Sequence, residues 1–403
     1  MTIKAGEQQL RRPSGVAPGT MPWPALVVLS LISFITLLAE TLPAGLLGHI
    51  ADSYAVSQSW AGQTVTVFAI GCVVGAVPLT RVTRNWPRRR VAHLIAATFA
   101  VVMAASALAP TLGALLGLRF LAGLATGLSW AAIPSYARVI APPHLAGRAI
   151  AATAMGATLA FTIGVPLGTL VGNATSWRVA FAALAAIGGL VCIVALRVLP
   201  PVRPAPASTG SSVRAALGMP AVVFAIAACG LFAFAHTLSY NYVSPLADGL
   251  GRGAQLGAVL GAFGVASLAG ALLAGSFGDR HPRVLTICGS LALAVVFVLL
   301  VVAARDGGLT WLIWPSAIAW GAAFGMAAPL LQTATAHAAG AAADAAQAVL
   351  VTIWNGALAL GGVVGGVVLD RAGWTGVPWP SLLAAAGALT IVVFAGVARA
   401  SDG

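Results

Sequence analysis

Charged side chains are scarce in this sequence. Asp, Glu, Lys and Arg make up only 7% of the 403 residues, whereas roughly a quarter of the residues of an average soluble protein are charged. Hydrophobic residues account for 60% of the chain, and the mean hydropathy is +0.97. This composition excludes an ordinary soluble domain and indicates a chain that crosses a membrane many times.

Several motifs of enzymes and pumps are also missing. Lys4 is the single lysine, so the chain has no phosphate-binding G-x-x-x-x-G-K-[ST] loop and no means of driving a pump with ATP. Neither an H-E-x-x-H helix nor a G-x-S-x-G turn occurs, which argues against a metalloprotease or a serine hydrolase. No repeated filter sequence suggests a channel, and no segment is long enough for the soluble domain that a membrane sensor should carry.

Cysteines are few, and all four lie within apolar stretches: Cys72, Cys192, Cys229 and Cys288. Cysteines in such positions usually act as small hydrophobic residues, so we expect no disulfide and no metal site. We predict no cofactor.

Long apolar segments are abundant. A transmembrane helix needs about 20 mostly apolar residues, and we find twelve such segments, predicting an all-α polytopic membrane protein. They are approximately 24–47, 60–80, 91–109, 111–137, 149–172, 178–199, 221–243, 255–277, 284–304, 309–336, 345–369 and 378–398. The first 22 residues have no apolar core of the signal-peptide kind, so we expect the first segment to be retained.

The basic residues are unevenly distributed over the loops. With twelve spans, 16 of the 21 Lys and Arg fall on one side of the membrane, four on the other, and Arg119 lies inside a span. Basic loops stay in the cytoplasm, so this asymmetry places both termini there. It also explains the net charge of +12 without nucleic-acid binding.

The chain divides into two similar halves. A stretch rich in Pro, Ser and Gly, residues 199–220, separates six spans from six. We expect a tail (1–22), a first bundle (23–199), a cytoplasmic linker (200–219), a second bundle (220–399) and a short tail (400–403). Pro87 aligns with Pro282 at an offset of 195 residues, and repeats of this kind are typical of secondary transporters.

Small residues recur at every fourth position in two equivalent spans. The fifth span carries Gly156, Gly164, Gly168 and Gly172, and the eleventh carries Gly361 and Gly365. Such faces let helix backbones approach closely. Static packing and a moving interface both fit this pattern.

On several of these segments the chain resembles the major facilitator superfamily, specifically its twelve-span drug–proton antiporters and sugar efflux transporters. "GSFGDRHPRV" (275–284) looks like the family's loop signature, and "RFLAGLATG" (119–127) looks like its fourth-span arginine motif. "GATLAFTIGVPLGTLVG" (156–172) is similar to the antiporter motif, although Gly164 and Pro166 are separated here by Val165. "AETLPAGLL" and "WNGALALGGVVGG" look most like the sugar-efflux and chloramphenicol-resistance branch.

The resemblance implies a loop that controls conformation in each half. Its residues here would be Arg84, Arg88, Arg89, Asp279, Arg280 and Arg283. The first-half loop departs from the signature, because Thr80 and Arg84 stand where the second half has Gly275 and Asp279. We therefore expect no latch through an aspartate in the first half, and we expect the arginines there to act mainly on membrane topology.

Only Glu40, Arg119 and His236 are ionisable residues deep within spans, and such residues are functional candidates by default. The resemblance implies that spans 1, 4, 7 and 10 line a central cavity, where Glu40 and Arg119 lie at similar depth. Burial disfavours a charged carboxyl and a nearby arginine favours it, so Glu40 could carry a proton across. The alternative is a fixed Glu40–Arg119 ion pair, direct or through water, that only positions two helices.

His236 lies at a matching depth in the seventh span, one position from Glu40 by the repeat offset. Histidine titrates near neutral pH, which allows a second role in coupling or substrate binding. A lone histidine among apolar residues is more often satisfied by a neighbouring group.

Aromatic and amide side chains suggest a substrate wall. The candidates are Trp130, Tyr240, Asn241, Tyr242, Gln332, Trp354 and Asn355. They suit amphipathic or sugar-like ligands, and they equally suit the aromatic belts at the membrane surface.

We therefore predict a proton-coupled exporter of small molecules in a bacterial cytoplasmic membrane, working as a monomer by rocking of its two halves. Its partners would be the substrate, protons and the lipid bilayer, with no nucleic acid. The alternative is a proton-independent facilitator or importer of a small polar metabolite such as a sugar or nucleoside. The direction of transport follows from the resemblance alone.

Overall fold

The computed structural model describes residues 20–202, 213–278, 280–305 and 309–394. All regular structure in these residues is helical, and twelve helical segments are long and apolar enough to cross a membrane. The predicted all-α fold and its twelve spans are thus confirmed. The split near Pro110 is real, because one helix ends at Ala107 and the next begins at Leu112.

The first half consists of six membrane-crossing segments, one of which is interrupted. Its elements are α1 (Trp23–Gly45), α2 (Leu47–Tyr54), α3 (Gln58–Val82), α4 (Arg88–Ala107), α5 (Leu112–Ile140), η1 (Pro143–Leu145), α6 (Ala146–Leu159), η2 (Ala160–Gly164), α7 (Val165–Ala174) and α8 (Trp177–Val198). The fifth segment runs through α6, η2 and α7, where η2 is a π-helical turn.

The second half repeats this plan after a short linker helix, α9 (Val213–Leu217). Its elements are α10 (Pro220–Asn241), α11 (Val243–Gly249), η3 (Gly253–Gln255), α12 (Leu256–Phe277), α13 (Pro282–Arg305), η4 (Thr310–Leu312), α14 (Ile313–Ala339), η5 (Gly340–Ala342), α15 (Ala343–Ala372), η6 (Trp374–Gly376) and α16 (Pro378–Phe394).

Local sequence explains where several helices begin. Ser57, Thr111 and Ser176 precede α3, α5 and α8, and each side-chain oxygen accepts a hydrogen bond from a backbone N–H of the first turn, at 3.1–3.3 Å. These N-caps satisfy donors that have no partner within the helix. They fix the short connections that return the chain into the membrane.

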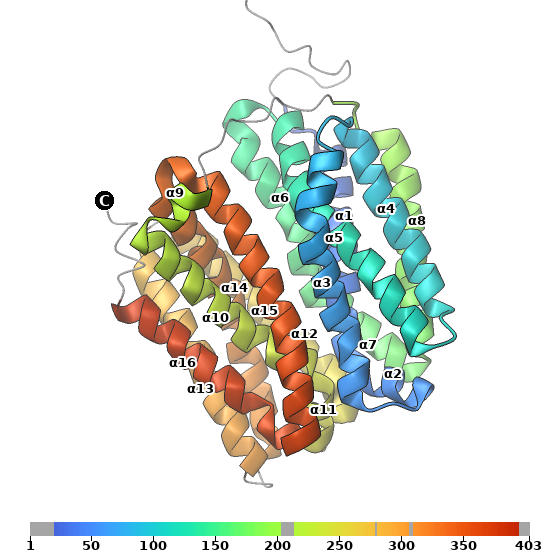
Figure 1. Cartoon of the computed structure of the whole chain (residues 1–403), viewed down its shortest axis with the longest axis vertical. Coiled ribbons are helices and arrows are strands. Elements are labelled where there is room, and N and C mark those ends of the chain that lie inside the picture. The colour runs from blue at the N-terminus through green and yellow to red at the C-terminus, as the bar shows by residue number, and fades with distance from the viewer. Residues whose placement is uncertain (1–19, 203–212, 279, 306–308, 395–403) are drawn as a thin grey trace, which may run out of the picture.

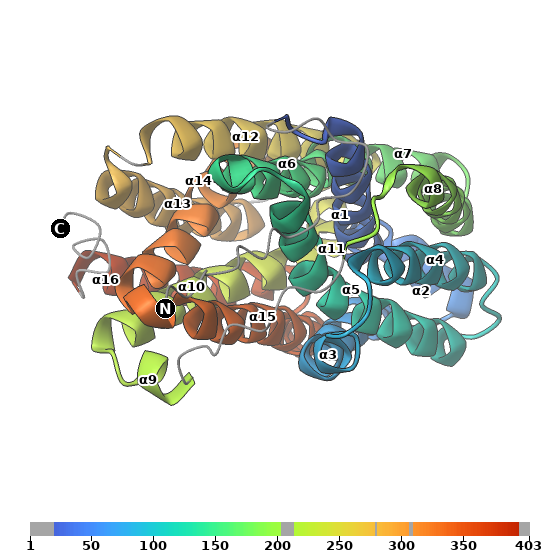
Figure 2. The ribbon, with the colours of Figure 1, turned by 90° about the horizontal axis from the view of Figure 1, so that it is seen from above.

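The helices form two bundles that lie side by side (Figures 1 and 2). Elements α1–α8 pack with one another and α10–α16 do the same. The bundles meet along two interfaces, as the view from above shows (Figure 2). In one, α6, η2 and α7 lie beside α12, and in the other, α3 lies beside α15. The bundles lean together at the end that carries α2 and α11 and apart at the end that carries α9 (Figure 1).

Glycines bring equivalent helices into backbone contact within each bundle. A Cβ atom on Gly123 of α5 would lie 2.0 Å from the carbonyl oxygen of Phe68 in α3. In the second bundle, a Cβ on Gly321 of α14 would lie 2.0 Å from the carbonyl oxygen of Phe263 in α12. Close helix packing of this kind replaces the hydrophobic effect, which does not drive helix association in lipid.

The first segment of each half breaks at an equivalent residue. Leu46 (φ −121°, ψ 15°) separates α1 from α2, and Tyr242 (φ −113°, ψ 27°) separates α10 from α11. Glu40 lies six residues before the first break and His236 six residues before the second. The local offset is therefore 196 residues, and His236 is the structural counterpart of Glu40 rather than a position one residue away.

Candidate functional site

A central cavity of about 1220 Å³ lies between the two bundles. Its walls come from α1, α5, α6 and η2 on one side and from α12, α13, α14 and α15 on the other. Its mouth includes Arg138, near the end of α5, and His337, near the end of α14. Glu40 and Phe161 lie toward its inner end, where the bundles converge, so the cavity is open at one end of the molecule.

Among the described residues that line the cavity, Glu40 is the one acidic residue. It is buried, with 7% of its surface exposed, and its Oε2 atom has no hydrogen-bond partner in the described structure. The indole of Trp130 lies beside the carboxyl group and offers it a hydrogen bond. Next to this site, the hydroxyls of Thr36 and Ser129 lie 3.1 Å apart and hold α1 against α5.

Arg119 is fully buried behind Glu40, and it binds main-chain oxygens. Its Nε donates to the carbonyl of Thr64 at 3.0 Å, one Nη donates to the carbonyl of Ala39, and the other donates to the carbonyl of Glu40 at 3.2 Å. Its guanidinium also lies 4.4 Å from the centre of the Phe68 ring. The arginine thus joins α5 to α1 and α3.

The predicted direct pairing of the Glu40 and Arg119 side chains is absent from this conformation. Among the described residues, no hydrogen bond or ion pair links the guanidinium to the carboxylate oxygens. The guanidinium instead donates to carbonyls of α1 and α3, which take three of its five N–H groups. Its positive charge remains close to the carboxyl group, so it acts on Glu40 through space.

His236 lies in an aromatic cluster rather than on the cavity wall. It is 3% exposed, its ring centroid lies 4.0 Å from that of Phe324, and its Nδ1 accepts a hydrogen bond from the Trp320 indole at 3.0 Å. Phe161 and Phe324 stand between this cluster and the cavity, which they both line. In this conformation His236 is thus satisfied by a neighbouring group, as one of the two interpretations of the sequence held. A role of His236 in proton coupling stays a prediction.

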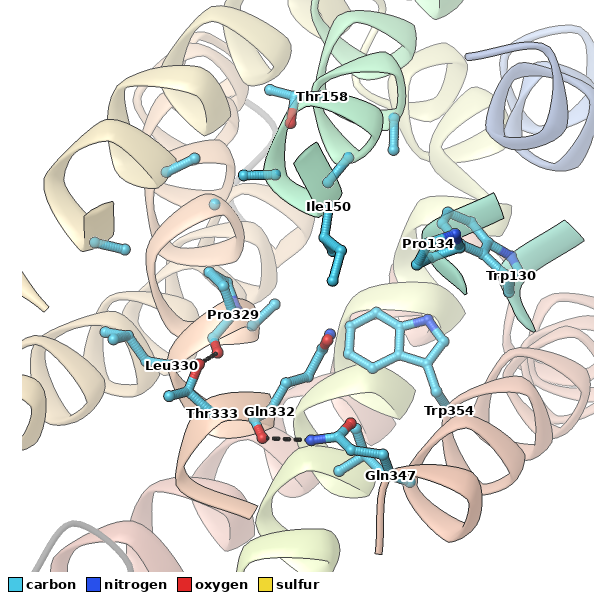
Figure 3. Close-up of a pocket in the computed structure, with 18 of the residues that line it drawn as sticks. Trp130, Pro134, Ile150, Thr158, Pro329, Leu330, Gln332, Thr333, Gln347 and Trp354 are labelled. Atoms are coloured by element: carbon cyan, nitrogen blue, oxygen red, sulfur yellow. Dashed lines mark hydrogen bonds between the residues drawn. The ribbon is translucent and has the colours of Figure 1, made fainter. Parts of the chain in front are cut away.

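The cavity contains four of the seven predicted wall residues, namely Trp130, Gln332, Trp354 and Asn355. Figure 3 shows Trp354 projecting into the space, with Gln332 beside it and Trp130 across from it. Asn355 is 5% exposed and donates to the carbonyl of Val351 at 2.9 Å.

The other three predicted wall residues do not line this cavity. Tyr240 joins the aromatic cluster, where its ring centroid lies 5.2 Å from that of His236. Asn241 is 2% exposed, and the hydroxyl of Tyr242 donates to the carbonyl of Gly362 at 2.6 Å. These residues surround the break after α10, at the end where the bundles converge, so they help to close that end.

Several lining residues were missed in the sequence. Gln347 also lines the cavity, and its amide donates to the carbonyl of Gln332 at 2.8 Å (Figure 3). A polar residue early in an apolar span was the available signal for Gln347. Phe161 and Phe324 gave no signal, because phenylalanine is ordinary in a transmembrane helix.

The glycines of the fifth segment pack along α1. Cβ atoms on Gly156, Gly164 and Gly168 would come within 3 Å of Ser30, Phe34 and Leu42 of that helix, and a Cβ on Gly172 would come within 3 Å of Leu46, which follows it. Pro166 faces the other way, toward Gly261 of α12. In α15, Gly361 and Gly365 approach α10, whereas Gly362 approaches Thr66 of α3. The small residues that recur at every fourth position therefore make most of their contacts within their own bundle.

The predicted loop residues lie at the end of the molecule where the cavity opens. Arg89 donates a side-chain hydrogen bond to the carbonyl of Leu196, and the backbone N–H of Arg88 donates to Val202 at 3.1 Å. Arg84 follows α3, and Arg280 and Arg283 flank the start of α13. Asp279 lies outside the described residues.

Comparison with known proteins gives consistent matches over the chain. The profile of the Major Facilitator Superfamily matches residues 29–357 and 226–401. A chloramphenicol efflux pump of Mycobacterium tuberculosis is 32% identical over 378 residues, covering 89% of this chain and 90% of the pump. A probable sugar efflux transporter of Helicobacter pylori is 26% identical, covering 86% of this chain and 88% of that protein.

Solved structures match the fold. A D-xylose–proton symporter superposes with a TM-score of 0.75 at 17% identity, covering 92% of this chain and 97% of the symporter. A bacterial homologue of the human lysosomal transporter Spinster, in an inward-facing and unoccupied conformation, superposes with a TM-score of 0.70 at 16% identity and covers 96% of this chain and 98% of that one.

Proposed function

The chain belongs to the Major Facilitator Superfamily, and we propose that it exports small molecules in exchange for protons. As a member of this family it is a multi-pass membrane transporter of small molecules rather than an enzyme. The proton coupling, the outward direction and the substrates belong to the proposal.

The observation that carries the proposal is the position of Glu40. One carboxyl group lines a cavity of about 1220 Å³, and one of its oxygens has no hydrogen-bond partner. Buried ionisable groups inside membranes are costly and mark proton relays or substrate paths. A carboxyl at this place can gain or lose a proton according to what occupies the cavity.

The surroundings of Glu40 give it two opposed influences. Burial disfavours the charged carboxylate, whereas the Trp130 indole and the nearby charge of Arg119 favour it. A substrate that enters beside Trp130 alters the balance, and a change in the packing of the bundles alters it again. We propose that Glu40 releases its proton to the cavity mouth when substrate binds, and takes up a new one when the cavity opens on the other side.

Alternating access would proceed by rocking of the two bundles. At the converged end, the contacts of α3 with α15 and of η2 and α7 with α12 would loosen. The cavity mouth would close at the opposite end. We propose that His236 and the aromatic cluster around it keep the converged end shut in this conformation, and that Arg280 and Arg283 act at the opposite end during the switch.

We also propose an orientation and a division of the chain. The basic loops support a cytoplasmic position for the cavity mouth and both termini, with the protein in the inner membrane of a bacterium. Residues 23–199 and 220–399 would be the two moving bundles, joined by the linker 200–219. Because the cavity lies within one chain, a monomer suffices for transport.

The relatives favour export over the alternatives. The proteins named above are called a chloramphenicol efflux pump and a probable sugar efflux transporter, and both match most of the chain. An importer or a proton-independent facilitator is the second candidate, because a proton symporter for xylose shares the fold. Fold alone does not decide direction.

Proton exchange in everted membrane vesicles tests the proposal. Vesicles from cells that produce the wild type, Glu40→Gln or Asp370→Asn are energised to an acid interior, and chloramphenicol and sugars are added in turn. Asp370 is the matched control, since it is an exposed acid near the end of α15 and outside the cavity. We expect one compound to dissipate the pH gradient with the wild type and with Asp370→Asn, but not with Glu40→Gln.

Two results would count against the proposal. Equal dissipation by Glu40→Gln and the wild type would make Glu40 a structural residue. Transport of a compound by the wild type without any effect on the pH gradient would favour the proton-independent facilitator.

A further inference from the structure

The wall of the cavity is divided by polarity. Side chains able to form hydrogen bonds or carry charge come mainly from α5, α14 and α15, together with Glu40 of α1, and include Gln332, Gln347 and Asn355. The wall formed by α6 and α12 is nearly all aliphatic up to Thr158 and Ser267, at the inner end. Figure 3 shows Ile150 of α6 on one side of the space and the two glutamines on the other.

The two helices of the aliphatic wall, α6 and α12, make few contacts with each other, and we call the stretch where they face each other the α6–α12 seam. The seam is lined by Ala151, Ala154, Met155, Ala271, Ala274 and Gly275. Helix α12 packs closely on η2 and α7 but touches α6 only sparsely. A Cβ atom on Gly275 would have nothing within 4 Å, and Met155 lines the cavity while 43% of its surface stays exposed.

The seam ends where η2 begins. The hydroxyl of Thr162 donates to the carbonyl of Gly264 at 3.1 Å, and a Cβ on Gly264 would lie 2.3 Å from the carbonyl oxygen of Phe161. The two bundles therefore touch at this level. Met155 is nine residues into α6 counted from Ala146, roughly 14 Å along the helix, so the seam is deep enough to face lipid.

From this arrangement we infer that the substrates are neutral amphiphiles that enter the cavity sideways, from the membrane through the α6–α12 seam. The inference rests on the proposed function and narrows it, because it selects drug-like over sugar-like substrates. An aromatic or aliphatic part of the substrate would lie against α6 and α12, and its amide or hydroxyl groups would face the glutamines, Asn355 and Trp130.

A sugar fits this cavity poorly. Its hydroxyl groups surround the ring, and those turned toward the alanines and Met155 would lose water without gaining a partner. Each hydroxyl that is left without a partner weakens binding. The seam offers a sugar no polar path either, because its lining residues carry no hydrogen-bonding side chain.

The test uses the full-length protein in lipid nanodiscs, with chloramphenicol and arabinose as probes. Binding is followed by the change in total tryptophan fluorescence, to which Trp130 and Trp354 contribute from the cavity wall among 11 tryptophans. The variants are Gly275→Phe, which adds a ring to the seam, and Gly189→Phe on α8, which is outside the cavity. A Cβ atom at either position would have nothing within 4 Å. Ala154→Phe plugs the seam from the other helix and must behave like Gly275→Phe.

We expect chloramphenicol to bind the wild type and Gly189→Phe at the same rate. Filling the seam should slow association and dissociation several-fold together, with a smaller change in affinity, because the route and not the bound state is obstructed. Arabinose should bind much more weakly to all forms.

Two outcomes overturn the inference. If both seam variants bind chloramphenicol at the wild-type rate while eluting as folded monodisperse protein, the seam is not the route. If arabinose binds as tightly as chloramphenicol, the substrate class is wrong. Binding in nanodiscs requires no proton gradient, so failure of the proton-exchange test would leave these results intact.

Discussion

Glu40 and His236 occupy equivalent positions in the two halves and have different surroundings. Glu40 lines an open cavity and keeps one oxygen without a partner, whereas His236 stacks on Phe324 and accepts a hydrogen bond from Trp320. The difference comes from the rings packed around the histidine, since η2 and α14 contribute Phe161 and Phe324 to its side of the cavity. One of two equivalent residues is thereby free to respond to the cavity contents.

We predict that His236 contributes to stability through the hydrogen bond that its ring accepts from Trp320. His236→Phe leaves the buried Trp320 N–H without an acceptor, which costs roughly 1–3 kcal/mol, whereas the carbonyl of His236→Gln can still accept. Thermal unfolding in detergent should therefore rank the wild type and the glutamine variant above the phenylalanine variant. A changed pH profile of transport in His236→Gln, at unchanged stability, would instead assign the histidine a role in coupling.

Arg119 should act on stability through the backbone and on Glu40 through its charge. Replacing it by methionine leaves the carbonyls of Thr64, Ala39 and Glu40 without their donor, at roughly 1.5–3 kcal/mol for each hydrogen bond to a charged group. Arg119→Lys keeps the charge with fewer donors and should unfold at an intermediate temperature. If the Arg119→Met variant were inactive but as stable as the wild type, the arginine would act only through its charge on Glu40 and not on stability.

The sequence located Glu40 and Arg119 at the correct depth but not their contacts. Depth follows from counting residues along a span, whereas a contact depends on how far each helix is rotated about its axis. The weak patterning of these apolar helices says little about that rotation. Trp130 and Trp354 line the cavity whereas Tyr240 to Tyr242 lie outside it, and the sequence offered no way to tell these two groups apart.

At the scale of elements, the fifth segment is organised by its contact with α1. A Cβ on Gly156 would lie 1.8 Å from the carbonyl oxygen of Ser30, and the π-helical turn follows four residues later. Helix boundaries were predictable from hydropathy and from capping residues such as Ser57. The π-helical turn was not, because nothing in the sequence separates it from the α-helix around it.

We predict that Gly156→Ala destabilises the protein and that Gly147→Ala does not. Both glycines lie in α6, but a Cβ on Gly147 would have nothing within 4 Å. Overpacking a rigid contact typically costs about 1–3 kcal/mol, and here the obstacle is backbone. Thermal unfolding of the two variants provides the measurement, and equal melting temperatures would show that α1 and α6 are less tightly packed than described.

At the scale of the whole molecule, the converged end brings acidic groups of both bundles together. Asp248 of α11 lies near His49 and Asp52 of α2. Burial, with a smaller effect of Asp52, raises the pKa of Asp248 above its ordinary value of 3.8, while His49 and a hydrogen bond from Ser244 oppose the rise.

This shift predicts a pH dependence with a definite sign. The folded protein holds the Asp248 proton more tightly than the unfolded chain does. Protonation of Asp248 therefore adds to the free energy of unfolding at a pH below the ordinary pKa of the group. This contribution is lost as the pH rises through the pKa that Asp248 has in the folded protein. Asp248→Asn should therefore be more stable than the wild type near neutral pH, and its stability should fall less as the pH rises above the ordinary pKa of an aspartate. Parallel profiles for the two proteins would rule out this contribution.

The central claim is that Glu40 exchanges its proton for substrate, and proton release on binding tests it most directly. Chloramphenicol is added to purified wild type and Glu40→Gln in weakly buffered detergent solution, with tryptophan fluorescence confirming that it binds. The account predicts a release approaching about one proton per chain from the wild type, because one carboxyl lines the cavity, and none from Glu40→Gln. Binding without release by the wild type, or equal release from both proteins, would contradict it.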